Sequence, residues 1–157
     1  MRKMVVLLAV AVSFLVSEPI KVTKDDIGVV RNIKVYKEPK WISKIVIKNT
    51  GKELFFCSPK SMFEFYFKPF RYREFGVKDL TGFKSITVTN YNNLDEIPAY
   101  KAFFVYGSRA IGPAGDDLAA FATKQEAEDF SKKYSGKRVF SFGDIKMALI
   151  NLLNGRI

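Results

Sequence analysis

The sequence predicts an α+β fold in which two related strand-strand-helix units pack together and an extra helix follows at the C-terminus. Alternating apolar segments occur in each half of the chain, a capped helix follows each set, and the two helix starts resemble one another. With 157 residues, 48% of them hydrophobic, the chain can form one compact domain or two very small ones. Fifteen Phe and seven Tyr against one Trp predict a core rich in phenyl rings.

Residues 1–17 are predicted to be a signal peptide or an N-terminal anchor. "MRK" followed by "MVVLLAVAVSFLV" joins a basic start to an apolar run of thirteen residues. This run is short for a bilayer core of roughly 30 Å and is typical of a secretory signal, with cleavage after Ser13 or Ser17. An uncleaved anchor in the inner membrane is the alternative. Either interpretation predicts a periplasmic or otherwise exported protein.

The first unit, with a polar lead, is expected to span residues 18–68. Apolar alternation predicts strands in residues 32–40 and 41–58, and "NTGK" at 49–52 predicts a hairpin turn within the second segment. Ser58 followed by proline is a typical helix start, so a helix is expected from there to "KP" at 68–69. Residues 69–83 lack a clear period and contain two glycines, which predicts a connection.

The second unit and a C-terminal strand and helix are expected in residues 84–157. Strands are predicted at 85–91, 99–108, 117–122 and 138–142. Thr123 and Glu126 have the spacing of a capping box, which predicts a helix start. The apolar stripe of this helix is predicted to be Ala127, Phe130 and Tyr134, and Gly136 is predicted to be its left-handed C-cap. A last helix is predicted from Asp144, with an apolar face formed by Ile145, Ala148, Leu149 and Leu152.

The two expected helix starts suggest an internal repeat offset by 65 residues. "FCSPKSMFEF" (56–65) and "FATKQEAEDF" (121–130) share Phe at both ends and a Ser or Thr cap at the third position, and Met62 matches Ala127. One small unit of this kind cannot bury its apolar face alone, but two packed together can. Convergence of ordinary capping signals is the alternative explanation.

The charge and residue usage exclude several classes of function. The formal net charge is +10, but the lysines between residues 37 and 52 alternate with apolar residues, as on a solvated sheet face, so no nucleic acid is expected as a partner. In an exported protein the charge favours acidic partners or an anionic membrane surface. A single Cys and no His exclude an internal disulfide and His-based catalytic or metal sites. "GPAGDD" lacks the Lys and Ser/Thr of a phosphate-binding loop, and adjacent carboxylates such as Asp116 and Asp117 are typical of caps and turns. We therefore expect no enzyme.

Five segments in order resemble the NosL family of nitrous-oxide reductase accessory proteins. They are "FFCSPKSMFEFYFKP", "VTNY", "IPAYKAFFVYGS", "GPAGDDLAAFATKQEAEDF" and "GKRVFSFGDI", within residues 31–145. The resemblance implies an exported protein, often a lipoprotein, with two related strand-strand-helix units. It also implies binding of one Cu(I) for delivery to the reductase.

The sequence departs from this family where the resemblance implies copper ligands. The family's Gly-Pro-Met-Gly turn is here Gly112, Pro113, Ala114 and Gly115, so alanine replaces a soft thioether. Alignment on Trp41 places residues 31–33, Arg-Asn-Ile, where the family has Cys-Gly-Met. Asn90 replaces the usual Asp, and no Cys is available to carry a lipid.

Cys57 and Met62 are the remaining candidates for a soft metal site in the expected units. Cys57 precedes a helix start, where the helix dipole would lower its pKa and favour a reactive or metal-binding thiolate. The favoured alternative is a small buried hydrophobe, and Met62 is expected to fill the core.

These features predict a non-enzymatic scaffold with a degenerate copper site that binds no cofactor, or Cu(I) only weakly. The turn at Gly112, Pro113, Ala114 and Gly115 would contact an exported partner, either nitrous-oxide reductase or one of its assembly factors. One alternative is a functional Cu(I) chaperone that uses Cys57 and Met62 in a rebuilt site or in a site between two chains. Another is a thiol-based redox or structural protein.

Overall fold

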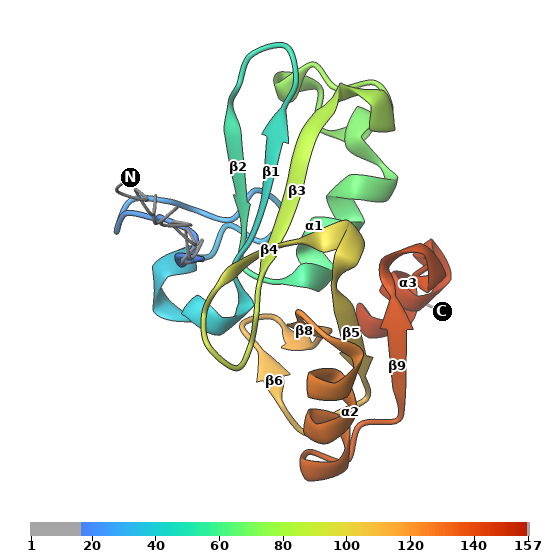
Figure 1. Cartoon of the computed structure of the whole chain (residues 1–157). Helices are drawn as coiled ribbons and strands as arrows, with labels where there is room; N and C mark the ends of the chain where they lie inside the picture. Colours follow the sequence, from blue (N-terminus) through green and yellow to red (C-terminus); the bar gives the residue numbers. More distant parts are fainter. Residues whose placement is uncertain (1–16, 157) are drawn as a thin grey trace, which may run out of the picture.

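The computed structural model describes residues 17–156, which form two antiparallel sheets, a small hairpin and three α-helices (Figure 1). This confirms the predicted α+β class. The predicted signal segment lies outside the described residues except for Ser17. None of the helices between residues 17 and 156 is long and apolar enough to cross a bilayer.

The first sheet has the strand order β2-β1-β3-β4. Strands β1 (Ser43–Ile47) and β2 (Glu53–Phe56) form the expected hairpin, and β3 (Phe83–Thr89) pairs with the other edge of β1. The short β4 (Glu96–Pro98) completes this sheet. Helix α1 (Pro59–Phe67) packs against β1 and β2.

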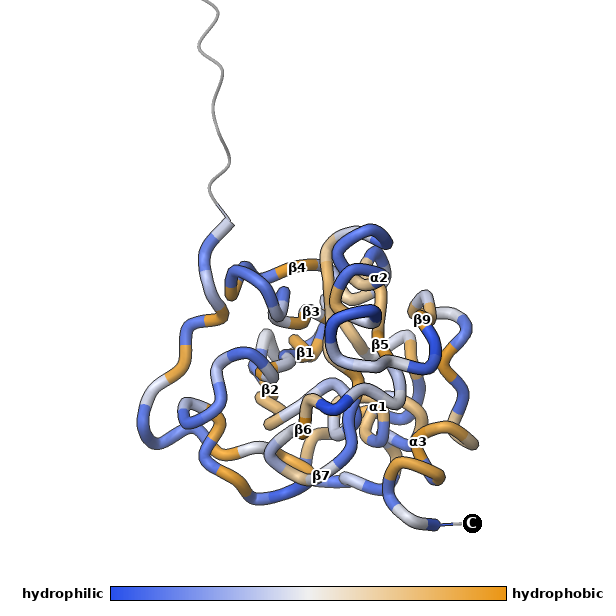
Figure 2. The backbone as a smooth tube through the Cα atoms, turned by 90° about the horizontal axis from the view of Figure 1, so that it is seen from below, coloured by the Kyte–Doolittle hydropathy of each residue, from blue (hydrophilic) through white to orange (hydrophobic). Residues whose placement is uncertain are grey.

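The second sheet has the order β8-β5-β9. Its central strand is β5 (Phe103–Tyr106), flanked by β8 (Ala119–Phe121) and β9 (Arg138–Ser141). Helix α2 (Lys124–Lys133) contacts all three strands. The hairpin of β6 (Ile111–Gly112) and β7 (Gly115–Asp116) lies between β5 and β8 in the chain. Helix α3 (Met147–Leu153) packs against α1, and Figure 2 contrasts its hydrophobic residues with the hydrophilic α2.

The two sheets repeat one pattern of connections. In each, the first strand lies in the centre, the second pairs with one edge, a helix follows, and the next strand pairs with the other edge. The helix caps Ser58 and Thr123 are 65 residues apart, as the repeat predicts. The repeated unit is therefore strand-strand-helix-strand. Strand β3, which begins at Phe83 beside the predicted boundary at residue 84, joins the first sheet together with β4.

Phenyl rings fill the space between the units, as the composition predicts. Phe63 of α1 is fully buried, and its ring centroid lies 5.3 Å from that of Phe104 on β5 and 4.9 Å from that of Phe142. Met62, Phe65 and Phe104 belong to the same buried cluster. The main core thus joins α1 of the first unit to β5 of the second.

Short 3-10 turns replace two of the expected strand segments. Residues 32–40 are not a strand: turns cover Val35–Lys37 and Pro39–Trp41, because proline has no N–H for a ladder and fixes its own φ. The expected strand at 99–108 begins only at Phe103, after a turn at Ala99–Lys101. Further 3-10 turns are Pro69–Arg71, Arg73–Phe75 and Leu80–Gly82 in the expected connection, and Phe142–Asp144 after β9.

Two predicted helix boundaries, the end of α2 and the start of α3, also differ from the structure. The left-handed residue after α2 is Ser135, with φ 56°, and not Gly136. A Cβ at Gly136 would lie 2.6 Å from Cγ1 of Val105, so glycine is needed there for space.

The last helix begins at Met147 and not at Asp144, which instead accepts a hydrogen bond from the Ser141 hydroxyl at 2.6 Å. The later start changes the buried face. Ile150 is fully buried, while Leu152 is 47% exposed.

Candidate functional site at the start of helix α1

Gly112 and Gly115 pair at the end of a hairpin with a two-residue loop, and this turn packs against Asp117. Gly115 has φ +90° with open space around its Cα, so its backbone conformation favours glycine. Gly112 is glycine for a different reason, since a Cβ there would lie 3.1 Å from Oδ2 of Asp117. Both glycines therefore serve the turn itself, whatever residue stands at position 114.

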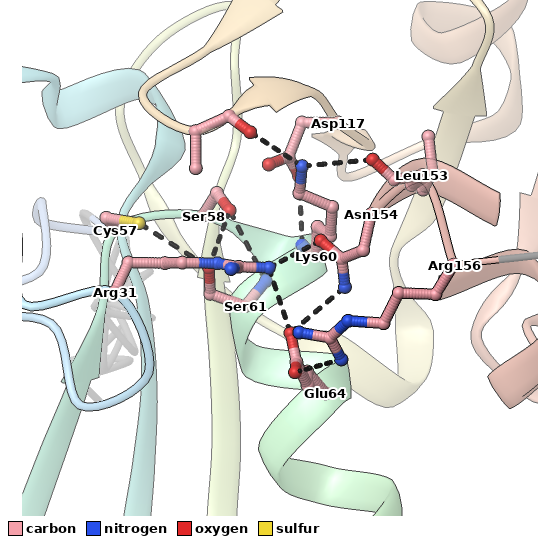
Figure 3. Close-up of polar contacts among 11 residues, drawn as sticks. Arg31, Cys57, Ser58, Lys60, Ser61, Glu64, Asp117, Leu153, Asn154 and Arg156 are labelled. Carbon is pink, nitrogen blue, oxygen red and sulfur yellow. Dashed lines mark hydrogen bonds and ion pairs between the residues drawn. The ribbon is translucent and has the colours of Figure 1, made fainter. Parts of the chain in front are cut away.

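The side chain of Lys60 reaches the turn from helix α1 (Figure 3). Its Nζ donates hydrogen bonds to the carbonyl oxygen of Ala114 at 2.8 Å and to that of Leu153 at 3.4 Å. Only 1% of Lys60 is exposed, and burial lowers the pKa of its ammonium group. One buried amine thus links the turn, α1 and the end of α3.

Asp117 completes the start of α1 from the second unit. Its Oδ1 accepts hydrogen bonds from the backbone N–H of Lys60 at 2.9 Å and of Leu118 at 2.8 Å. Its Oδ2 is buried and has no hydrogen-bond partner among residues 17–156. Burial raises the pKa of this carboxyl group, although the Ser58 hydroxyl, the two N–H groups and the charge of Lys60 act in the opposite direction.

Cys57 lies just before this helix start, in a core cluster with Ile20, Val35 and Ile42. It is 1% exposed, and its Sγ lies 3.5 Å from Oγ of Ser61. Burial raises the pKa of the thiol, in contrast to the lowered pKa expected from the helix dipole, because desolvation outweighs the hydrogen bond with the Ser61 hydroxyl. Met62 is fully buried in the main core, a different cluster.

Glu64, one turn after Lys60, holds a second set of charges on α1. Its carboxylate pairs with Arg31 at 3.0 Å and with Arg156 at 2.7 Å, and it accepts a hydrogen bond from Asn154 at 3.0 Å. Arg31 also donates to the side-chain oxygen of Asn154. Only 7% of Glu64 is exposed. These contacts fix the lead before β1 and the C-terminal segment on the same helix (Figure 3).

The structure therefore brings two predicted ligand positions to one helix. Ala114 is tied to α1 through Lys60, and Arg31, the first residue of the Arg-Asn-Ile segment, is tied to it through Glu64. In both places a charged side chain of the chain itself makes the contact. Among the described residues, no three Cys, His, Asp or Glu side chains form a group that could hold a metal ion.

Sequence reasoning missed the polar residues that build this site. Lys60 had a weak signal, a lysine inside an otherwise apolar helical segment. Asp117 is visible in the sequence only as one of two adjacent carboxylates. Asn154 and Arg156 had no local signal, since their partner Glu64 is 90 residues or more away.

Comparisons with known proteins show which family and which fold this chain resembles. The family model described as NosL matches residues 19–150. The crystal structure of the copper chaperone NosL from Shewanella denitrificans is similar with a TM-score of 0.67 and 22% identity, covering 84% of this chain and 98% of that one. The solution structure of apo-NosL from Achromobacter cycloclastes has a TM-score of 0.48 and 22% identity, covering 69% and 87%. None of the curated proteins matches the sequence.

Proposed function

Because the chain belongs to the NosL family, we propose that it is an exported accessory protein in the maturation of copper-dependent nitrous-oxide reductase. We further propose that it binds a protein partner as a non-enzymatic scaffold and that its copper site is degenerate. The periplasm is the proposed location, with residues 1–17 acting as a cleaved signal or as an anchor.

The contact between Lys60 and the turn carries this proposal. Cu(I) prefers thiolate and thioether ligands, but position 114 offers only its backbone carbonyl, which accepts a hydrogen bond from the buried amine. A cation of the chain itself thus occupies the inner side of the turn. Position 31 likewise carries a guanidinium group paired with Glu64 instead of a soft ligand.

The charges around the start of α1 also oppose a bound cation. The ammonium group of Lys60 donates to the Ala114 carbonyl, and the guanidinium groups of Arg31 and Arg156 pair with the carboxylate of Glu64. A further positive ion at the turn would be repelled by the ammonium group of Lys60, which is only 1% exposed, and charges in such a buried place are poorly screened. Cys57 does not offset this repulsion, because burial raises the pKa of its thiol and so disfavours the thiolate that would bind a cation.

The outer side of the turn is the proposed surface for the partner. Ile111, which leads into the turn, is 59% exposed, and Asp116 on the opposite strand is exposed as well. The inner side is fixed by Lys60 and Asp117, so the turn presents a defined shape. The partner would be another exported protein, either the reductase or one of its assembly factors.

An anaerobic Cu(I) titration against a chromophoric chelator tests the degenerate site. We expect that neither the wild-type protein nor Cys57→Ala removes one equivalent of copper from the chelator, because the soft ligands near the helix start, Cys57 and Met62, are both buried and lie in different core clusters. One bound copper that is lost in Cys57→Ala would identify a functional chaperone with a site rebuilt around Cys57. One bound copper that persists in the variant would reveal other ligands. Either result would contradict the degenerate site.

A further inference from the structure

A separate pocket of about 330 Å³ shares none of its lining residues with the Lys60 contacts. It is formed by the 3-10 turn that ends at Trp41, the loop between β3 and β4, and helix α2. Its walls are Tyr91, Phe130 and Tyr134, and its charged groups are Lys40, Lys133, Glu126 and Asp129. We propose that this pocket binds a small zwitterion that carries a quaternary ammonium group and an acidic group, as in glycine betaine.

Three aromatic rings form the apolar wall of this pocket. The ring of Phe130 lies 5.0 Å from that of Tyr91 at 65° and 4.5 Å from that of Tyr134 at 29°. Buried Trp41 packs edge-on against Tyr91 at 5.2 Å and fixes its orientation. Because Phe130 is buried and packs against both tyrosines, the aromatic faces open to a ligand are those of Tyr91 and Tyr134. Such faces attract methylated ammonium groups, which are large, weakly hydrated cations.

The ring faces already attract cations of the chain itself. Nζ of Lys40 lies 4.8 Å from the centre of the Tyr91 ring, and Nζ of Lys133 lies 5.3 Å from that of Tyr134. Both lysines are exposed and are flexible side chains. They can therefore move aside for a cation that also makes apolar contacts, and their ammonium groups remain at the rim.

Charges of both signs around the rings favour a zwitterion over a simple cation. Glu126 accepts hydrogen bonds from the backbone N–H of Thr123 at 3.0 Å and from the side chain of Asn90 at 3.3 Å. Asp129 accepts one from Gln125 at 2.8 Å. These contacts hold two carboxylates on α2 beside the rings. The ammonium part of the ligand would lie between rings and carboxylates, and its acidic part would meet the two lysines.

Fluorescence of Trp41 provides a direct readout, because it is the single Trp of the chain and contacts Tyr91. The full chain is titrated with glycine betaine and with 3,3-dimethylbutanoate, in which carbon replaces the ammonium nitrogen at the same shape. Binding is checked by calorimetry. We expect saturable binding of glycine betaine at least about tenfold tighter than that of the isostere, which keeps the carboxylate but lacks the ammonium charge, because only glycine betaine has cation–π attraction. Equal binding of the two, or no saturable binding in either method, would overturn the proposal.

Two comparisons, one between variants and one between probes, test which residues contact each part of the ligand. Tyr134→Leu is expected to weaken glycine betaine binding about tenfold, whereas Tyr134→Phe, which keeps the aromatic face, retains it. Lys40→Gln should weaken glycine betaine but not tetramethylammonium, which has no acidic group. If Tyr134→Phe lost binding as fully as Tyr134→Leu, or if Lys40→Gln affected both probes equally, the proposed arrangement would be wrong. The comparison of the two isosteres uses the wild-type protein and does not depend on the folding of any variant.

Discussion

Helices α1 and α2 begin with the same kind of cap but in different surroundings. Thr123 and Glu126 cap α2 reciprocally: the backbone N–H of Thr123 donates to Glu126 Oε2 at 3.0 Å, and that of Glu126 donates to Thr123 Oγ1 at 3.2 Å. Thr123 is exposed, and every part of this cap comes from one turn. Ser58 at the start of α1 is fully buried and accepts from the backbone N–H of Ser61 at 3.4 Å.

The start of α1 needs a second acceptor because water cannot reach it. Asp117 provides this acceptor for the N–H of Lys60, and Lys60 in turn holds the Ala114 carbonyl. A backbone donor without a partner in a buried place costs about 1–3 kcal/mol. The start of α2 is therefore capped by its own residues alone. The start of α1 is completed by Asp117 from the second unit and organises the candidate site.

Asp117→Ala should produce the largest loss of stability among these helix-start variants. The substitution leaves the N–H groups of Lys60 and Leu118 without their acceptor, so we expect the free energy of unfolding to fall by about 3 kcal/mol. Urea unfolding followed by circular dichroism measures this. The matched control is Asp116→Ala, at the exposed neighbouring residue, which should change stability by less than about 0.5 kcal/mol. Similar losses in both variants would refute a special role for Asp117.

Thr123→Ala should have a smaller effect, because water can replace the lost cap of α2. We expect the free energy of unfolding to fall by about 1 kcal/mol in the same urea experiment. Thr123→Ser keeps the hydroxyl group and should stay within a few tenths of a kcal/mol of the wild type. A loss in Thr123→Ala as large as that in Asp117→Ala would remove the distinction between the two helix starts.

Local signals in the sequence were sufficient for the elements that are stabilised locally. Ser58 with Pro59, and Thr123 with Glu126, mark the two helix starts, and the structure has both. Gly51, with φ 66°, lies in the turn of the first hairpin as expected. These features depend on residues within one turn of each other, which a short segment of sequence contains.

The polar contacts of the site could not be predicted in this way. Asp117 is 57 residues from Lys60, and Arg156 is 92 residues from Glu64. Such pairs form only after the two units have packed, so no spacing in the sequence reveals them. The pKa of Cys57 illustrates the same limit: the helix start was visible in the sequence, but the burial that dominates the thiol was not.

The finest test of the comparison is the pH dependence of stability at the start of α1. Burial raises the pKa of Asp117, so the folded state binds its proton more tightly than the unfolded state, in which the pKa is near the ordinary value of 3.8. The contribution of this proton to stability is fully present below that ordinary value. It is lost as the pH rises through the raised pKa of the folded state, because the buried carboxylate then becomes charged.

Asp117→Asn isolates this contribution, since the amide keeps an oxygen that can accept from the N–H groups of Lys60 and Leu118 but does not titrate. We expect the stability of the wild type relative to Asp117→Asn to be greatest near pH 4 and to decline toward pH 7, as measured by urea unfolding at each pH. A wild type that gained stability over the variant with rising pH would mean that the Ser58 hydroxyl, the two N–H groups and Lys60 together outweigh the cost of burial. In that case the start of α1 would be a favourable site for an anion. The expected decline instead means that the second unit completes the buried helix start at an electrostatic cost, which the exposed cap of α2 avoids.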